Sequence, residues 1–382
     1  MPLLTLRADQ MVSSTVFVSS KNTNFRPLRS PERKPGRGVS GRFYQYVTKC
    51  AVQPTRMDPR SGIRTLEFTL PAGAAALLPQ KATGITELPI RSYTEGCIRL
   101  RLRCSRRPKR ETYVRDSDWA ISDTTWPGEM YTFFNETAIE LPRKQHFRHD
   151  RPAELTDLAV EGPNVVKISL PDNKCNLSED STFFLAVEVV LTASRSFLEN
   201  GVRAARHTTA EETKKKIARR LTSTSPDDDV VAADTTLSIS LADPFSATMV
   251  EVPVRGVDCE HMECFDLGNW LASRPSKKSG GGEPSLADCW KCPICGRDAR
   301  PHRLHIDDFL VEVRAELLAD GKQRTKRIQV AADGSWVPVA EPEDSDDEGD
   351  APPPSGPAQE SSRVSSRSVP PAAAVIEILD DD

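Results

Sequence analysis

Two short motifs, Cys259-Glu-His261 and Cys292-Pro-Ile-Cys295, decide the fold of the C-terminal part of this 382-residue chain. Zinc binds four nitrogen or sulfur ligands in a tetrahedron, and a Cys-x-x-Cys turn supplies two thiolates to one ion. The Cys-x-His segment supplies the other two ligands. Thirty residues separate His261 from Cys292, which is enough chain to fold between the two halves of one site. The motifs therefore predict one zinc ion bound by Cys259, His261, Cys292 and Cys295.

Two further thiols and two histidines leave a second zinc site open as an alternative. Cys264 and Cys289 could supply half of that site, and His302 and His305 could complete it. Simpler interpretations exist, because a free cysteine at an apolar helix start, such as Cys264, is usually buried. We interpret Cys289 as an incidental thiol and the two histidines as solvated or helix-leading. A single ion with four protein ligands has no open position for water, which argues against a hydrolytic zinc enzyme.

Composition and charge exclude several classes of protein. Five of the nine cysteines lie between Cys259 and Cys295, which indicates metal binding rather than disulfides in a non-secreted chain. No run approaches the roughly 18 apolar residues of a membrane span, and the N-terminus lacks a signal-peptide core. The net charge is -4, but residues 341–382 hold 12 acids and 2 bases, so residues 1–340 carry -4 + 10 = +6. A basic body suits an anionic or acidic-surfaced partner.

The chain divides into six segments by composition and periodicity. In the N-terminal half we predict a disordered basic segment at 1–40, a β-rich, sandwich-like domain at 41–195, and a charged helix and linker at 196–234. A small α+β zinc module at 235–322 and a short β extension at 323–340 follow. A disordered acidic, Pro/Ser-rich tail occupies 341–382. The fold class is therefore multidomain, with a β-rich domain followed by a zinc module.

Alternating apolar residues predict the strands of the β-rich domain, at 63–70, 97–104, 131–134, 165–170 and 183–191. Within the second of these strands, Arg99, Arg101 and Arg103 alternate with apolar residues and predict one solvated face. Strands are also expected at 237–241 and 249–254. An apolar stripe predicts a helix after the second zinc motif, with Asp307 as its cap and Gly321 at its end. A hairpin follows, turning at Asp333-Gly334.

Residues 254–266, 290–295 and 304–307 together resemble the SP-RING (Miz-type) zinc finger of the Siz/PIAS family of SUMO ligases. The resemblance covers about residues 235–320, interrupted by a Ser/Gly/Lys-rich insertion near 275–288. In that family one zinc is bound by Cys-x-His and Cys-x-x-Cys, while packing replaces the second RING site. The resemblance therefore assigns the four ligands named above and leaves Cys264 in the core. Residues 141–156, with Pro-Ala-Glu-Leu-Thr, and the strand at 184–191 resemble the family's PINIT domain.

The resemblance implies a nuclear SUMO-protein ligase, an adaptor-type transferase that supplies no catalytic residue and forms no covalent SUMO intermediate. Its partners would be SUMO, the SUMO-charged conjugating enzyme and nuclear substrate proteins. Val257, Trp290, Pro293 and Ile294 would line an apolar groove that binds the conjugating enzyme, although Trp290 fits the module's core equally well. The family's DNA-binding SAP helices are not apparent in residues 1–40, so direct DNA binding stays undecided.

The chain's last residues carry a separate signal. A short β-branched strand can add to an exposed sheet edge, and flanking acids can meet a basic rim on the partner. The segment resembles a SUMO-interacting motif, whose SUMO-binding residues would be Val375, Ile376, Ile378, Leu379, Asp380, Asp381 and Asp382.

Three other functions compete with this interpretation. The finger could serve a non-enzymatic transcription or chromatin co-regulator as a protein-binding module. A nucleic-acid-binding zinc protein would need a basic recognition helix, whereas the helix at 307–319 is acidic and Lys214–Lys216 with Arg219 and Arg220 indicate a solvated helix face. A ubiquitin ligase with a full RING would need eight metal ligands where four are well placed.

Overall fold

The computed structural model describes residues 32–35, 41–57, 62–79, 81–82, 90–143, 150–171, 180–222, 235–276 and 284–339. Of the predicted disordered segments, residues 1–31, 36–40 and 341–382 lie outside these ranges. Four residues that we predicted to be disordered, Glu32–Pro35, instead form strand β1. No helix among the described residues is long and apolar enough to cross a membrane.

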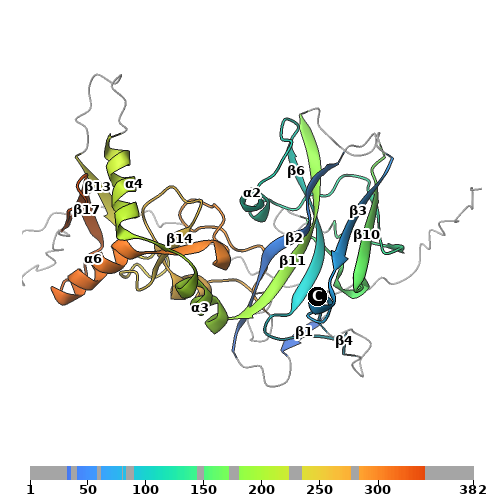
Figure 1. Ribbon diagram of the computed structural model, residues 1–382, viewed down its shortest axis with the longest axis horizontal. Helices are drawn as coiled ribbons and strands as arrows, with labels where there is room; N and C mark the ends of the chain where they lie inside the picture. Colours follow the sequence, from blue (N-terminus) through green and yellow to red (C-terminus); the bar gives the residue numbers. More distant parts are fainter. Residues whose placement is uncertain are drawn as a thin grey trace, which may run out of the picture. The chain divides into compact units, whose positions relative to one another are not determined.

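The predicted sandwich is present as two four-stranded sheets (Figure 1). One sheet has the order β3 (Ile63–Leu70), β10 (Gly162–Ser169), β7 (Tyr131–Phe134) and β8 (Thr137–Ala138). The other has the order β2 (Phe43–Met57), β11 (Ser181–Ser194), β6 (Ile98–Pro108) and β9 (Ala153–Glu154). One apolar cluster draws on both sheets, with Phe68 and Phe134 from the first and Leu100 and Val187 from the second.

The longest strand of the sandwich, β2, is one that the sequence pattern does not predict. Its 15 residues pair antiparallel with β11, with register shifts on the β11 side between Leu185 and Val187 and between Val189 and Val190. Only the first five residues are all buried, and the rest are mostly half-buried. This irregular burial leaves β2 without a regular alternation of apolar and polar residues, which is the usual signal of a strand.

Smaller elements complete the sandwich. A three-stranded sheet has the order β1, β5 (Ile90–Tyr93) and β4 (Lys81–Ala82). Short helices are α1 (Ala72–Ala75), α2 (Asp116–Ala120) and the 3-10 turn η2 (Thr156–Leu158). Helix α2 buries Trp119 completely, which holds this helix against the β2–β11–β6 sheet.

The arginines of β6 correct the expectation of a solvated face. Arg101 and Arg103 are only 5% and 1% exposed. Both pair with Glu188 of the neighbouring strand β11, at 2.5 Å from Arg101 Nε and 2.8 Å from Arg103 Nε. Arg101 also donates from Nη1 to Asp288 at 2.8 Å. The guanidinium groups are buried because carboxylates distant in sequence neutralise them, and Arg99 likewise pairs with Glu154.

Two sheets and four helices build the zinc-binding part. The first sheet has the order β12 (His207–Thr208), β16 (Leu304–Asp307), β14 (Pro253–Gly256) and β15 (Phe265–Asp266). The second sheet has the order β13 (Thr236–Ser240), β17 (Arg327–Ala331) and β18 (Trp336–Pro338). The helices are α3 (Arg195–Ala205), α4 (Ala210–Thr222), α5 (Leu267–Ala272) and α6 (Asp308–Ala319), with the 3-10 turn η3 (Pro301–Arg303). We call α4 together with residues 236–338 the zinc module; α3 and β12 precede it in the chain and pack against it.

The segment expected to be one charged helix contains two. Strand β12 separates α3 from α4 and pairs with β16, so the chain cannot continue as a single helix there. The α6 prediction is confirmed: Asp307 caps the helix by accepting from the Leu310 amide at 3.2 Å, and Gly321 follows its end at φ +72°. The hairpin turning at Asp333-Gly334 is also present as β17 and β18.

We predict that Glu188→Gln strongly destabilises the sandwich, because it removes the fully buried carboxylate that Arg101 and Arg103 share and leaves both guanidinium groups with Asp288 as their remaining acidic partner. Removing one partner of a buried ion pair costs about 3–5 kcal/mol of the free energy of unfolding, measurable by urea denaturation. Glu136→Gln is the matched control, since Glu136 is exposed and pairs with Lys167. It should change that free energy by less than about 1 kcal/mol. Equal small effects of the two variants would contradict this account.

Candidate metal centre

The structure brings the four predicted ligands to one point. Cys259, His261, Cys292 and Cys295 each offer one ligand atom, and all four atoms lie within 4.8 Å of one another. Turn hydrogen bonds shape the two loops, from the Cys259 amide to Gly256 O at 3.0 Å and from the Gly296 amide to Cys292 O at 2.9 Å. Zn–S bonds of about 2.3 Å and Zn–N bonds of about 2.0 Å in a tetrahedron need this spacing. The cluster fits one zinc ion.

The histidine of the cluster is already oriented to bind metal. His261 Nδ1 lies 2.9 Å from the backbone oxygen of Glu263, and a carbonyl oxygen can only accept. The proton is therefore on Nδ1, and Nε2 carries the lone pair. Nε2 faces Cys292 Sγ at 3.3 Å. A carbonyl that fixes the histidine tautomer in this way is the usual outer partner of a zinc-bound imidazole.

The pKa values of Cys292, a predicted ligand, and Cys264, a predicted core residue, shift in opposite directions. A hydrogen bond from the Cys259 thiol lowers the pKa of Cys292 to about 4, which favours the thiolate that zinc binds. Cys264 is 1% exposed, and burial raises its pKa to about 12. Cys264 packs in the apolar core with Met262 and Phe309. The hydrogen bond to Cys292 raises the pKa of Cys259 and burial raises that of Cys295, so the pKa direction does not distinguish the ligands from Cys264. The position of Cys264 in the apolar core, outside the ligand cluster, supports a single zinc ion and a structural Cys264.

The remaining candidates for a second site are scattered. His302 stacks on Tyr46 with ring centroids 5.6 Å apart. His305 is 6% exposed on β16, opposite Arg255 of β14, which corrects the expectation of a solvated histidine. Among the described residues, the four ligands named above form the one group of His, Cys, Asp and Glu that could hold a metal.

Gly256 lets the two zinc loops approach each other. A Cβ atom at this position would lie 2.4 Å from the backbone oxygen of Asp298 and 3.1 Å from Cys259 Sγ. The first distance is well inside van der Waals contact with a backbone atom that cannot swing away. Only glycine fits between the first ligand and the loop that follows the second motif.

Ion pairs connect the loops around the metal ligands. Arg297 pairs with Glu260 at 2.8 Å, which joins the second zinc loop to the first. Arg303 pairs with Asp258 at 2.8 Å and so ties the first loop to η3. Arg297 also donates to the backbone oxygen of Asp258 at 2.5 Å. The loop geometry thus has support from protein contacts in addition to the four ligands.

The predicted conjugating-enzyme groove is exposed in part. Val257 and Ile294, one on each zinc loop, are 38% and 41% exposed, and Pro293 is exposed as well. Trp290 corrects the prediction, because it is only 3% exposed and cannot line a docking surface. Its ring packs against Trp270 at 6.2 Å, and its Nε1 donates to the backbone oxygen of Gln45 at 2.6 Å. Of the two alternatives for Trp290, the core position is the one observed.

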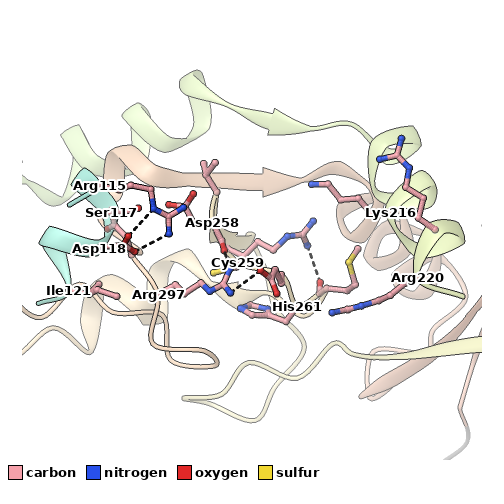
Figure 2. Close-up of a pocket in the computed structure, with 16 residues that line it drawn as sticks. Arg115, Ser117, Asp118, Ile121, Lys216, Arg220, Asp258, Cys259, His261 and Arg297 are labelled. Carbon is pink, nitrogen blue, oxygen red and sulfur yellow. Dashed lines mark hydrogen bonds and ion pairs between the residues drawn. The ribbon is translucent and has the colours of Figure 1, made fainter. Parts of the chain in front are cut away.

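A groove of about 870 Å³ runs beside the first zinc loop (Figure 2). Its lining comes from three places. Helix α2 and its two flanking residues contribute Arg115, Ser117, Asp118 and Ile121, and α4 contributes Lys216, Arg219 and Arg220. Strand β14 and the zinc loops contribute Arg255, Val257, Asp258, Cys259, Glu260, His261, Met262, Arg297 and Asp298. We call it the α4 groove. Sequence reasoning missed this groove, because three segments separated by long stretches of chain form it. The predicted SUMO-interacting residues 375–382 lie outside the described residues.

The zinc finger has known relatives. Residues 239–298 match the family model of the MIZ/SP-RING zinc finger. The E3 SUMO-protein ligase gei-17 of Caenorhabditis elegans is 27% identical over 55% of this chain and 28% of that protein. Zinc finger MIZ domain-containing protein 2 of Homo sapiens is 25% identical over 57% of this chain and 22% of that protein. The E3 SUMO-protein ligase pli1 of Schizosaccharomyces pombe is 30% identical over 33% and 15%.

Fold, metal centre and relatives agree on the class. The chain is a β-rich protein with one zinc-binding MIZ/SP-RING finger. Parts of the chain are similar to proteins named E3 SUMO-protein ligases, and residues 239–298 carry the MIZ/SP-RING finger. The chain spans between 15% and 28% of the length of the three relatives described here.

We predict that Gly256→Ala lowers the zinc content, because the added methyl group pushes Asp298 O and Cys259 Sγ apart. Zinc can be counted by elemental mass spectrometry of the purified chain, with a thermal melt alongside. Gly201→Ala in α3 is the matched control, since a Cβ there meets nothing within 4 Å. That control should keep its zinc and gain about 0.5–1 kcal/mol of stability. Full zinc content in Gly256→Ala would show that the loops tolerate the extra atom.

We also predict that Cys264→Ala keeps one zinc per chain while Cys295→Ala loses it. Cys264 is a buried core residue, whereas Cys295 Sγ lies 3.5 Å from Cys259 Sγ inside the ligand cluster. Native mass spectrometry of both variants measures the zinc stoichiometry directly. Loss of zinc from Cys264→Ala, with the fold retained by circular dichroism, would point to a different ligand set.

Proposed function

We propose that this protein is a SUMO-protein ligase that recruits the SUMO-charged conjugating enzyme through its SP-RING finger. The observation that carries this proposal is the pair of exposed apolar residues on the zinc loops, Val257 and Ile294, beside a metal site that protein ligands fill completely. A filled site holds the loops in place and has no position for a substrate or water. The exposed surface that it supports therefore does the binding.

The reaction needs no nucleophile from this chain. SUMO arrives as a thioester on the conjugating enzyme, and a substrate lysine attacks the thioester carbonyl and displaces the enzyme's cysteine. The ligase contributes orientation, since holding two reactants together replaces a bimolecular encounter by an effectively unimolecular step. The β-sandwich would act as the PINIT-like domain that presents the substrate lysine. The proposal places the protein in the nucleus, with nuclear substrates, and assigns SUMO binding to residues 375–382.

We predict that the chain accelerates SUMO conjugation and that Val257→Ala with Ile294→Ala removes most of this effect. Buried interface anchors commonly contribute more than about 1.4 kcal/mol, which is tenfold in affinity. The assay contains activating enzyme, limiting conjugating enzyme, SUMO, ATP and a lysine substrate, with and without the chain.

Val311→Ala is the matched control, because Val311 is 42% exposed but lies on α6, away from the zinc loops. The double variant should keep its zinc, so that lost activity reflects the surface rather than the fold. If neither conjugating-enzyme binding nor acceleration appears with the intact chain, the co-regulator interpretation replaces the ligase.

A further inference from the structure

The α4 groove has one wall made only of cations. Lys216, Arg219 and Arg220 line it, and their spacing of three and four residues puts them on one face of the helix. Figure 2 shows Lys216 and Arg220 on α4 across the groove from the α2 residues. Thr213 and Ile217 occupy the buried face of the same helix. The three cations are exposed.

The opposite wall carries acids that already have partners. Asp118 pairs with Arg115 at 2.8 Å, and Glu260 pairs with Arg297 at 2.8 Å. Asp258 and Asp298 pair with arginines of η3 and the adjoining loop. Among the described residues, no ion pair involves Lys216 or Arg219, whereas Arg220 has an interaction partner. The uncompensated charge of the groove is therefore positive and lies on the α4 wall.

A structural role explains only part of this wall. Cations in the last turn of a helix stabilise it through the macrodipole, and Arg219 and Arg220 occupy the last turn of α4. Lys216 lies in the middle of the helix, where this effect has faded. Its charge nevertheless faces the same groove.

We propose that the α4 groove binds an acid-rich peptide segment of the substrate protein, next to the lysine that receives SUMO. The position favours this occupant, because Val257 of the conjugating-enzyme surface also lines the groove. Charge complementarity would draw the segment to the α4 wall and orient it. This inference rests on the proposed ligase function and adds a substrate class to it.

The lining favours a peptide over a nucleic acid. Asp118 and Glu260 remain exposed on the wall facing α4, with 37% and 77% of their side chains accessible, and would repel a phosphate backbone. The groove is lined by no Phe, Tyr or Trp on which a base could stack. A peptide can place its acids toward α4 alone.

The test is a binding measurement on the 382-residue chain without conjugating enzyme, SUMO or ATP. The probe is a fluorescein-labelled glutamate-rich peptide with one lysine, followed by fluorescence anisotropy at physiological ionic strength. Lys216→Glu with Arg219→Glu should weaken binding at least about tenfold, equal to 1.4 kcal/mol. Lys109→Glu with Arg110→Glu makes the same change of charge at exposed positions outside the groove and should leave binding unchanged.

Each other outcome overturns the proposal. It fails if the intact chain does not bind the peptide, if a peptide with glutamines in place of the glutamates binds equally well, or if both double variants lose binding alike.

Tighter, α4-dependent binding of a DNA duplex would assign the groove to nucleic acid. The labelled peptide could also bind only after the acids among residues 341–350 are changed to amides. That result would show that this acidic segment of the chain itself occupies the α4 groove. Because the assay contains no ligase components, its failure leaves the conjugation result standing, and the reverse also holds.

Discussion

The ligation of one zinc ion by two loops is the constraint on which the functional surface depends. Cys259 and His261 follow β14, while Cys292 and Cys295 lie beyond the insertion, and their ligand atoms converge within 4.8 Å. Two clusters of buried apolar residues pack around the zinc loops, and structural zinc contributes on the order of 10 kcal/mol more in zinc-finger modules. The positions of Val257 and Ile294 depend on the ion, because Val257 lies two residues before the ligand Cys259 and Ile294 lies directly before the ligand Cys295. The α4 groove depends on the same first loop.

Hydrogen bonds also join the region around the second zinc loop to strand β2 of the sandwich. Ser285 closes the base of the insertion through its bridge to Ser276, and its amide donates to Phe43 O of β2 at 3.0 Å. Arg300 donates to Val47 O of the same strand at 2.8 Å. Together with the Trp290 bond to Gln45 O, these contacts join the second zinc loop to the start of β2. An adaptor that orients two bound proteins needs this kind of fixed connection between its binding parts.

The metal centre and the sandwich could be predicted because their signals are local. The four ligands stand in two short motifs, and from Thr65 to Leu70 strand β3 alternates exposed and buried residues. The buried arginines could not be predicted in the same way, since Arg101 meets Glu188 and Asp288, which lie 87 and 187 residues away. The lone Glu188 within the apolar run of β11 was the available clue. Trp290 was ambiguous because its partners, Tyr44 and Tyr46, belong to the strand that lacks a pattern.

The most direct test of this account is a single-turnover measurement of SUMO discharge from the charged conjugating enzyme to lysine. The chain is compared as purified, after removal of zinc with a chelator, and after zinc is restored. We expect acceleration by the zinc-loaded chain, loss of the acceleration on removal and recovery on reloading, because the ion fixes the loops that we propose to bind the enzyme. An equal discharge rate in all three states, with zinc content verified, would contradict the central claim.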